Sequence, residues 1–179
     1  MDTDESGFFF SYTVFIHLLF LGFFMKKVVF SGVFDPVTFG HVNIIERAAK
    51  MFPEVIVAVA ESSSKQSMWS VAQRTQLMQV AVEHLTNVKV RSFSGLLVDF
   101  LKAQKVTTII RGVRSVIDWS YEVEMADINH KMMPDVETLF LSAQENMSST
   151  YVRQIWGLGG NVSSLVPPKT LELMKKFKV

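Results

Sequence analysis

A turn-forming segment that ends in a histidine is the part of the sequence best suited to hold a phosphate. It reads SGVFDPVTFGH from Ser31 to His41 and directly follows a short apolar run. Gly32 lets the backbone approach a ligand closely, and Pro36 makes the turn rigid. Gly40 and His41 stand where a helix is expected to begin, and the unpaired N–H groups and dipole of a helix N-terminus favour an anion. The segment predicts a phosphate site, although a histidine here on its own would more often only cap the helix.

Further groups suited to phosphate occur later in the chain. Lys65 comes after three serines that follow the second apolar run, Arg111 and Arg114 follow the fourth, and Ser148–Thr150 precedes a helical segment. Each alone has an ordinary structural explanation, as a solvated lysine, a surface ion pair or a helix N-cap. Their occurrence together at the ends of successive elements indicates a ligand site.

The elements that must position these groups alternate between strand and helix. Short runs rich in β-branched and aromatic residues, typical of parallel strands buried on both faces, lie at Val28–Phe30, Val55–Ala60, Val88–Phe93, Thr107–Ile110 and Thr138–Leu141. Helical periodicity or capping signals predict helices at Val42–Phe52, Ser70–His84, Leu96–Gln104, Thr150–Trp156 and from Pro167 to about Phe177. The alternation predicts a single-domain α/β fold, a doubly wound, Rossmann-like parallel five-stranded sheet with helices on both faces. Ligands bind such sheets at the carboxyl ends of the strands, where we expect the groups above to meet.

Residues 1–24 differ in composition from the expected domain, residues 25–179. Phe8–Phe24 is a dense aromatic and aliphatic run, and no Lys or Arg precedes it. Three interpretations stay open: translation that begins at Met25, a membrane anchor or surface helix, and a secretory signal. We favour the first, because Met25 leads directly into the first strand and leaves little room for an anchor. Residues 1–24 are then a mis-assigned start or a disordered or accessory extension, and no membrane partner is expected.

Composition excludes several classes of function. The chain of 179 residues has no cysteine, which excludes disulfides, thiolate metal sites and cysteine nucleophiles and suits the cytoplasm. The net charge of +1 is too small for a nucleic-acid-binding surface but is compatible with small anionic substrates. No cluster of His, Asp and Glu in the sequence indicates a dedicated metal site. We expect a cytoplasmic protein that binds no nucleic acid.

The first segment resembles the T/HxGH signature of the nucleotidylyltransferase superfamily, in the FDPxTxGH form of the bacterial phosphopantetheine adenylyltransferase family. The later segments fall in the order that this family requires, with RGVR at Arg111–Arg114 similar to RGxR and MSSTYVR at Met147–Arg153 similar to ISSTxVR. The resemblance covers residues 25–179. It implies transfer of AMP from ATP to 4′-phosphopantetheine, giving dephospho-coenzyme A and pyrophosphate in coenzyme A biosynthesis.

The resemblance also implies a role for each matching residue. His41 is the expected transition-state stabiliser. The residues implied to bind ATP are Val33, Phe34, His41, Gly112, Val113, Arg114, Glu122, Ser148, Ser149 and Thr150, and those implied to bind the acceptor substrate are Val33, Lys65, Leu97 and Arg111. Mg²⁺ is expected to be held by the nucleotide phosphates and not by a protein site. Because related enzymes form hexamers and are inhibited by coenzyme A, a homohexamer and feedback inhibition are implied as well.

The sequence departs from the family pattern at Ser120, which replaces a usual acidic residue at the surface, and at two places that bear on the site. Val33 stands where members usually have a threonine whose hydroxyl contacts phosphate, and the segment between Leu141 and Ser148 is shorter than usual. These departures keep open a function of a different class, a degenerate relative that binds coenzyme A or nucleotide without turnover.

Another adenylyltransferase, specific for nicotinate or nicotinamide mononucleotide, is the nearest alternative within the superfamily. Such enzymes usually carry a histidine where Thr38 stands and lack the arrangement of Lys65 and Arg111–Arg114. These residues together favour phosphopantetheine.

Overall fold

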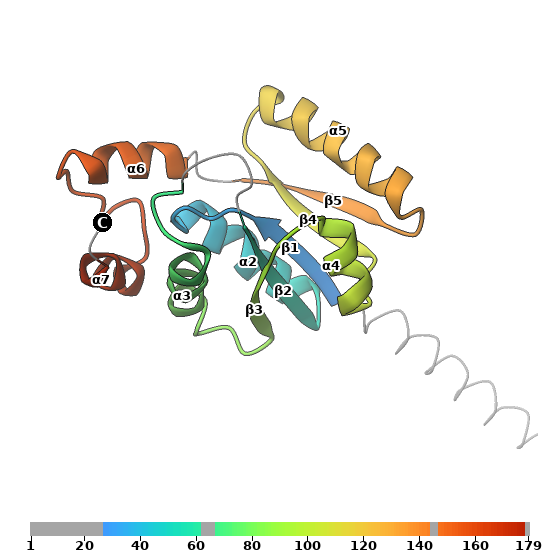
Figure 1. Cartoon of the computed structure of the whole chain (residues 1–179), viewed down its shortest axis with the longest axis horizontal. Helices are drawn as coiled ribbons and strands as arrows, with labels where there is room; N and C mark the ends of the chain where they lie inside the picture. The colour runs from blue at the N-terminus through green and yellow to red at the C-terminus, as the bar shows by residue number, and fades with distance from the viewer. Residues whose placement is uncertain (1–26, 62–66, 144–146, 178–179) are drawn as a thin grey trace, which may run out of the picture.

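The computed structural model describes residues 27–61, 67–143 and 147–177, without the side chain of Ile117. At its centre is a five-stranded sheet in the order β3-β2-β1-β4-β5, in which all neighbouring strands are parallel (Figure 1). The strands are β1 (Lys27–Gly32), β2 (Glu54–Ala60), β3 (Val88–Phe93), β4 (Thr108–Val113) and β5 (Glu137–Ser142). This architecture confirms the predicted doubly wound α/β fold.

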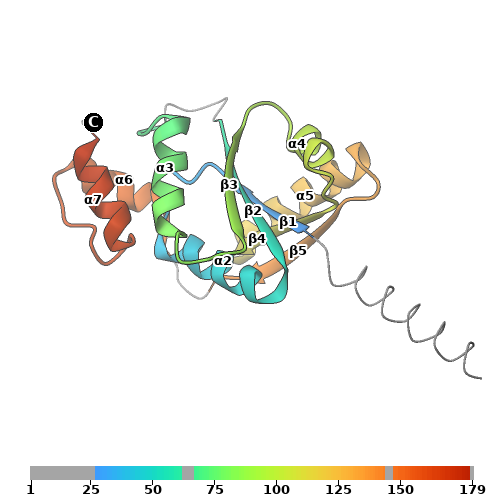
Figure 2. The same ribbon diagram turned by 90° about the horizontal axis from the view of Figure 1, so that it is seen from below.

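Helices cover both faces of the sheet. They are α2 (Phe39–Met51), α3 (Val71–Ala81), α4 (Leu97–Gln104), α5 (Val116–Met132), α6 (Ser149–Gly157) and α7 (Pro168–Lys176). The larger apolar core lies between the sheet and α2 and α3, and Val152 of α6 and Met174 of α7 extend it. A smaller core lies on the opposite face, where Leu101 of α4 packs against the strands. Figures 1 and 2 show α6 and α7 at the end of the domain far from residue 27, beside α3.

The central strands are buried on both faces. Val28 and Phe30 of β1 pack into the larger core, whereas Val29 packs into the smaller one. Successive side chains of a strand point to opposite faces of the sheet. A strand with two covered faces is therefore apolar throughout, which explains the continuous apolar runs in β1 and β2.

The longest helix, α5, is the element that the sequence analysis did not predict. Glu122, implied as an ATP-binding residue, is the one candidate site residue named from this stretch of the sequence, and it lies in the second turn of this helix. No α5 residue whose side chain is described is fully buried. Its large exposed apolar residues are Val116, Trp119, Tyr121, Ile128 and Met132. Because these residues form no single buried stripe, the helical periodicity that reveals α2 is missing here.

The remaining differences concern the ends of elements. The helix predicted over Ser70–His84 ends at Ala81, and the helix predicted from Val42 begins at Phe39. Gly40 and His41 therefore belong to the first turn of α2. In the ranges that the structure covers, no helix has the length and apolar character needed to cross a bilayer. Phe8–Phe24 lies outside the described residues, so the interpretation of residues 1–24 stays a prediction.

Candidate active site

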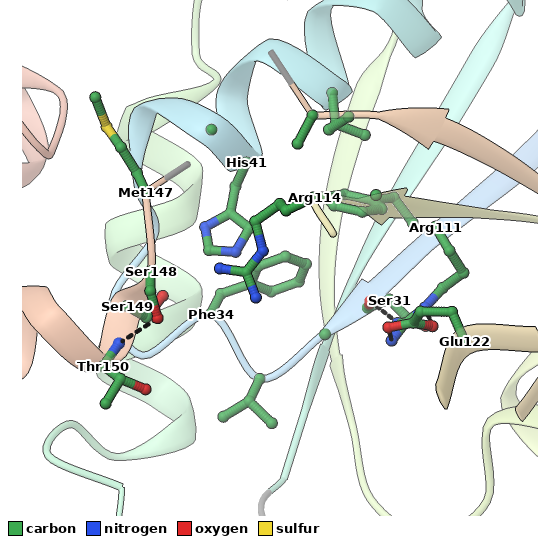
Figure 3. A pocket seen from close by; sticks show the side chains of 17 residues that line it. Ser31, Phe34, His41, Arg111, Arg114, Glu122, Met147, Ser148, Ser149 and Thr150 are labelled. Atoms are coloured by element: carbon green, nitrogen blue, oxygen red, sulfur yellow. Dashed lines mark hydrogen bonds and ion pairs between the residues drawn. The ribbon is translucent and has the colours of Figure 1, made fainter. Parts of the chain in front are cut away.

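A cavity of about 270 Å³ opens at the carboxyl ends of β1 and β4 (Figure 3). The strand order reverses between these two strands, because β1 pairs with both β2 and β4. A crevice at such a reversal is where doubly wound sheets bind ligands. The cavity is lined by Phe30, Ser31, Gly32, Val33, Phe34, Gly40, His41, Ile44, Arg111, Gly112, Arg114, Glu122, Ala143, Met147, Ser148, Ser149 and Thr150.

This cavity brings together most of the residues that the resemblance implies for ATP. They are Val33, Phe34, His41, Gly112, Arg114, Glu122, Ser148, Ser149 and Thr150. In Figure 3, His41 and Arg114 lie between the Ser148–Thr150 turn on one side and the pair of Arg111 and Glu122 on the other. Val113 does not line this cavity and instead contributes to a groove beside Trp119. Lys65 lies outside the described residues.

His41 is held in one orientation by the start of α2. It is the third residue of the helix, and the backbone N–H of Thr38 donates to its Nδ1 at 3.0 Å. In a capping box this position is usually a Glu or Gln that accepts the same bond. Because Nδ1 accepts, the neutral ring carries its proton on Nε2, and this N–H is the donor left for a ligand. The ring also packs edge-on against Phe34, with ring centroids 5.1 Å apart.

The surroundings of His41 keep its imidazole neutral. Burial of the ring, and then the positive charges of Arg114 and Arg111, lower the pKa of His41 from 6.5 to about 4. At neutral pH the side chain is therefore an uncharged donor next to two cations. Such a fixed donor in a cavity can stabilise negative charge that develops on a phosphate oxygen.

The Arg111 guanidinium is fixed by Glu122 and the end of β1. Its Nε and Nη2 donate to the two carboxylate oxygens of Glu122, at 2.5 and 2.7 Å, and its Nη1 donates to the carbonyl oxygen of Ser31 at 2.5 Å. The Arg111 side chain is 25% exposed and that of Glu122 is 13% exposed. Glu122 thus orients Arg111 in this structure. The contact of Glu122 with the nucleotide, which the resemblance implies, stays a prediction.

Arg114 is held less firmly than Arg111. Its Nε donates to Asp118 at 3.1 Å, one turn along α5, and the Arg114 side chain is 37% exposed. An exposed ion pair of this kind contributes little free energy. Movement of the Arg114 guanidinium toward an anion in the cavity would therefore cost little free energy.

The N-terminus of α6 closes the opposite side of the cavity. Ser148 caps the helix by accepting from the backbone N–H of Thr150 at 3.2 Å. The hydroxyl of Ser149 donates to the carbonyl of Pro36 at 2.8 Å, which ties α6 to the loop between β1 and α2. The helix terminus presents backbone N–H groups and the positive end of its dipole to the cavity, an arrangement suited to phosphate.

Arg74 supports the site and was not named by the sequence analysis. This residue of α3 is only 2% exposed, and its Nη1 donates to the carbonyls of Val33 and Ala60, at 2.5 and 2.8 Å. Burial lowers its pKa, and the charges of Asp35 and Glu61 act in the opposite direction. Its spacing of three residues from Leu77 and seven from Ala81, on the buried face of the helix, was the available signal. Nothing in the sequence shows which carbonyls it binds.

Asp35 was missed as well. Its carboxylate is buried and accepts from the backbone N–H groups of Met68 and Trp69, at 2.9 and 3.1 Å. Its backbone carbonyl accepts from Nη1 of Arg153 at 2.5 Å. Asp35 therefore connects the loop between β1 and α2 both to the start of α3 and to α6.

A second cavity, of about 380 Å³, adjoins the first on the side of α4 and α5. The residues shared by the two cavities are Ser31, Gly32, Val33, Arg111 and Glu122. Leu97 lines the second cavity, together with Tyr121, Met125 and Asn129 of α5. These α5 residues were not predicted as site residues, because the sequence pattern does not reveal their helix. The two cavities together can take two ligands that meet at the shared wall.

The chain resembles known proteins both in sequence and in fold. The cytidylyltransferase-like family model matches residues 29–155. The chain is 46% identical over 155 residues to the phosphopantetheine adenylyltransferase of Actinobacillus succinogenes, covering 85% of this chain and 96% of that protein. It is 44% identical over 155 residues to the phosphopantetheine adenylyltransferase of Mannheimia succiniciproducens, covering 84% and 98%.

A solved structure shares the fold at lower sequence identity. It is a Vibrio parahaemolyticus protein assigned as a nicotinate-nucleotide adenylyltransferase, with a TM-score of 0.65 and 18% identity, and the match covers 84% of this chain and 99% of that one. At this identity the match supports the fold alone. The curated relatives, in contrast, agree in sequence with this chain over nearly their whole length. The chain therefore belongs to the phosphopantetheine adenylyltransferase family, within the cytidylyltransferase-like proteins.

Proposed function

We infer that this enzyme transfers AMP from ATP to 4′-phosphopantetheine, giving dephospho-coenzyme A and pyrophosphate. The observation that carries this inference is the pair of adjoining cavities with a shared wall at Ser31–Val33 and Arg111. The first has cationic and N–H donors suited to a triphosphate, and the second has an apolar lining suited to an extended acceptor. With ATP in the first and the acceptor in the second, the reacting phosphates meet at the shared wall.

The reaction needs no catalytic base, because the nucleophile is already an anion. A phosphate oxygen of the acceptor forms a bond to the α-phosphorus of ATP, and the bond from that phosphorus to the pyrophosphate oxygen breaks. Catalysis then consists of positioning and charge stabilisation. Arg111 holds the attacking phosphate, Nε2–H of His41 donates to an α-phosphate oxygen, and Arg114 with the N-terminus of α6 holds the departing pyrophosphate.

Release of pyrophosphate tests this function. The full chain is incubated with ATP, Mg²⁺ and 4′-phosphopantetheine, and in parallel with nicotinamide mononucleotide and ATP or with a CTP-dependent pair. We expect release with phosphopantetheine alone. Release only with nicotinamide mononucleotide would assign the chain to a different adenylyltransferase activity.

The second candidate function is binding of coenzyme A or nucleotide without turnover. The valine at position 33 favours it. Its side chain is 40% exposed in the shared wall and offers no hydrogen bond there. A thermal shift with coenzyme A, combined with no pyrophosphate release from any substrate pair, would support this candidate over the enzyme.

Mg²⁺ is the proposed cofactor, and the nucleotide would hold it. Within the described ranges, no group of three or more His, Asp or Glu side chains is placed to bind a metal ion. Phosphate oxygens and water therefore supply the expected ligands, and the ion would neutralise charge on the phosphates. Loss of activity with EDTA and its recovery with Mg²⁺ would support this assignment.

We also propose a homohexamer, and exposed apolar residues on α5 and β5 support assembly. Trp119 packs against Phe140 with ring centroids 4.7 Å apart, yet Trp119 is 47% exposed. Leu139, on the opposite face of the edge strand, is 43% exposed. Uncovered apolar surface and an open sheet edge favour association. Sedimentation should give a mass six times that of one chain.

Coenzyme A is the proposed feedback inhibitor, because it combines an adenine nucleotide with pantetheine and suits both cavities at once. Competition of coenzyme A with 4′-phosphopantetheine in the pyrophosphate assay tests this proposal.

A cytoplasmic location is proposed from the composition and the substrates, and cell fractionation tests it.

A further inference from the structure

Ser31 is a polar side chain in an otherwise apolar stretch of the central strand. It is 6% exposed and lies in the sequence VVFSG of β1. Because side chains alternate along a strand, Ser31 points to the same face as Val29, which packs in the smaller core toward α4. A hydroxyl buried in such a place costs free energy unless it makes hydrogen bonds. The Ser31 hydroxyl therefore requires a hydrogen-bond partner.

The hydrogen bonding of this hydroxyl is incomplete. Nη1 of Arg111 lies 3.3 Å from Ser31 Oγ, and the same nitrogen makes its shorter bond, at 2.5 Å, to the carbonyl oxygen of Ser31. Within the described part of the chain the hydroxyl makes no other hydrogen bond. It acts there as an acceptor, so that its proton remains available to a ligand.

The position of Ser31 indicates which group of the ligand would accept a hydrogen bond from this hydroxyl. Ser31 and Arg111 line both cavities and therefore belong to the wall where the two substrates meet. Figure 3 shows the side chains of Ser31, Arg111 and Glu122 together at this wall. A phosphate bound to the remaining N–H groups of Arg111 comes within reach of the neighbouring hydroxyl. The bidentate bonds to Glu122 offset the charge of Arg111, so a further donor there strengthens binding of a phosphate dianion.

We propose that the Ser31 hydroxyl donates a hydrogen bond to the phosphate of 4′-phosphopantetheine that Arg111 holds. This inference rests on the proposed function and adds a substrate-binding residue to it. Val33, two residues further along the same wall, has no hydroxyl to offer. Ser31 reaches the phosphate from the side of Arg111 and so provides a neutral donor that Val33 lacks.

Ser31→Ala is a clean test, because alanine keeps the backbone carbonyl that accepts from Arg111 and removes only the hydroxyl. We expect calorimetry on the full chain to give a Kd for 4′-phosphopantetheine about 10–100-fold weaker than that of the wild type, as for the loss of a hydrogen bond to a charged group. The KM for ATP should stay within about threefold. Ser92→Ala changes an exposed serine on β3 that lines neither cavity; it is the matched control and should bind like the wild type.

Two further measurements separate a phosphate contact from a structural effect. Pantetheine, which lacks the phosphate, should bind the wild type and Ser31→Ala equally well. Val33→Thr should improve kcat/KM more in the Ser31→Ala background than in the wild type, because the two hydroxyls would serve the same phosphate and their effects would not add.

An unchanged Kd for 4′-phosphopantetheine in Ser31→Ala, or an equal loss for pantetheine, would overturn the assignment of Ser31. Binding without pyrophosphate release by the wild type would reject the proposed function, and the comparison of Kd values would still decide the role of Ser31. No binding of 4′-phosphopantetheine by the wild type would overturn both.

Discussion

His41 should make the stability of this protein sensitive to acid in a defined pH range. Its pKa is lowered to about 4 in the folded protein, mainly by burial and then by Arg114 and Arg111, against 6.5 in the unfolded chain. Above pH 6.5 the imidazole is neutral in both states and its contribution to stability is fully present. Between pH 6.5 and about 4 the unfolded state binds a proton that the folded state does not. Stability is therefore lost as the pH falls through this range.

The size of the effect follows from the two pKa values. Each pH unit within the range costs about 1.4 kcal/mol of unfolding free energy, and the whole range costs at most about 3 kcal/mol. The ring is partly open to the cavity, so that solvent reduces this figure.

His41→Gln isolates this contribution. Glutamine at the third position of a helix can accept the same backbone N–H of Thr38, so the cap on α2 is kept while the titrating group is removed. We expect urea denaturation at several pH values to show the wild type losing up to about 3 kcal/mol relative to this variant between pH 7 and 4. Wild type and variant curves that fall in parallel over this range would refute the argument, as would an NMR titration that places the His41 pKa near 6.5.

Three further predictions concern the site and its support. His41→Ala should lower kcat by about 10²–10³, as expected for loss of one preorganised donor, with a much smaller effect on ATP binding, and a kcat within about threefold of the wild type would contradict its role. Val33→Thr should raise kcat/KM in the pyrophosphate assay by about tenfold or more, because it adds a hydrogen bond to a charged phosphate, and an unchanged value would show that another group already makes this contact. Arg74→Leu should destabilise the fold by about 3 kcal/mol or more in urea denaturation, because the buried carbonyls of Val33, Ala60 and Trp69 lose their donor, and a loss below about 1 kcal/mol would rule out this structural role.

The fold was accessible from the sequence because the central strands and most helices carry their own local signals. The runs around Val28–Phe30 and Val55–Ala60 are apolar throughout since both faces are covered, and the amphipathic pattern of α2 reports one buried face. The same reasoning failed for α5. This helix has no fully buried residue among the described side chains, so its sequence carries no periodic contrast.

Placement of the candidate site residues was partly accessible for a similar reason. In a parallel sheet, the residues that follow each strand all lie at the same edge of the sheet. The motifs at His41, Arg111 and Ser148–Thr150 could therefore be assigned to one site before their distances were known, and the structure places them around one cavity.

What the sequence by itself determined is thus the order of the elements other than α5, the family and the edge of the sheet where the candidate site lies. Only the tertiary structure decided which side chains meet there. The bonds from Arg111 to Glu122 and Ser31, and from Arg74 to Val33 and Ala60, join residues on different elements. Local sequence patterns report whether a residue is buried, because burial repeats with the period of a helix or strand. They carry no information about which residue a side chain will contact, because the contact depends on how separate elements pack against one another.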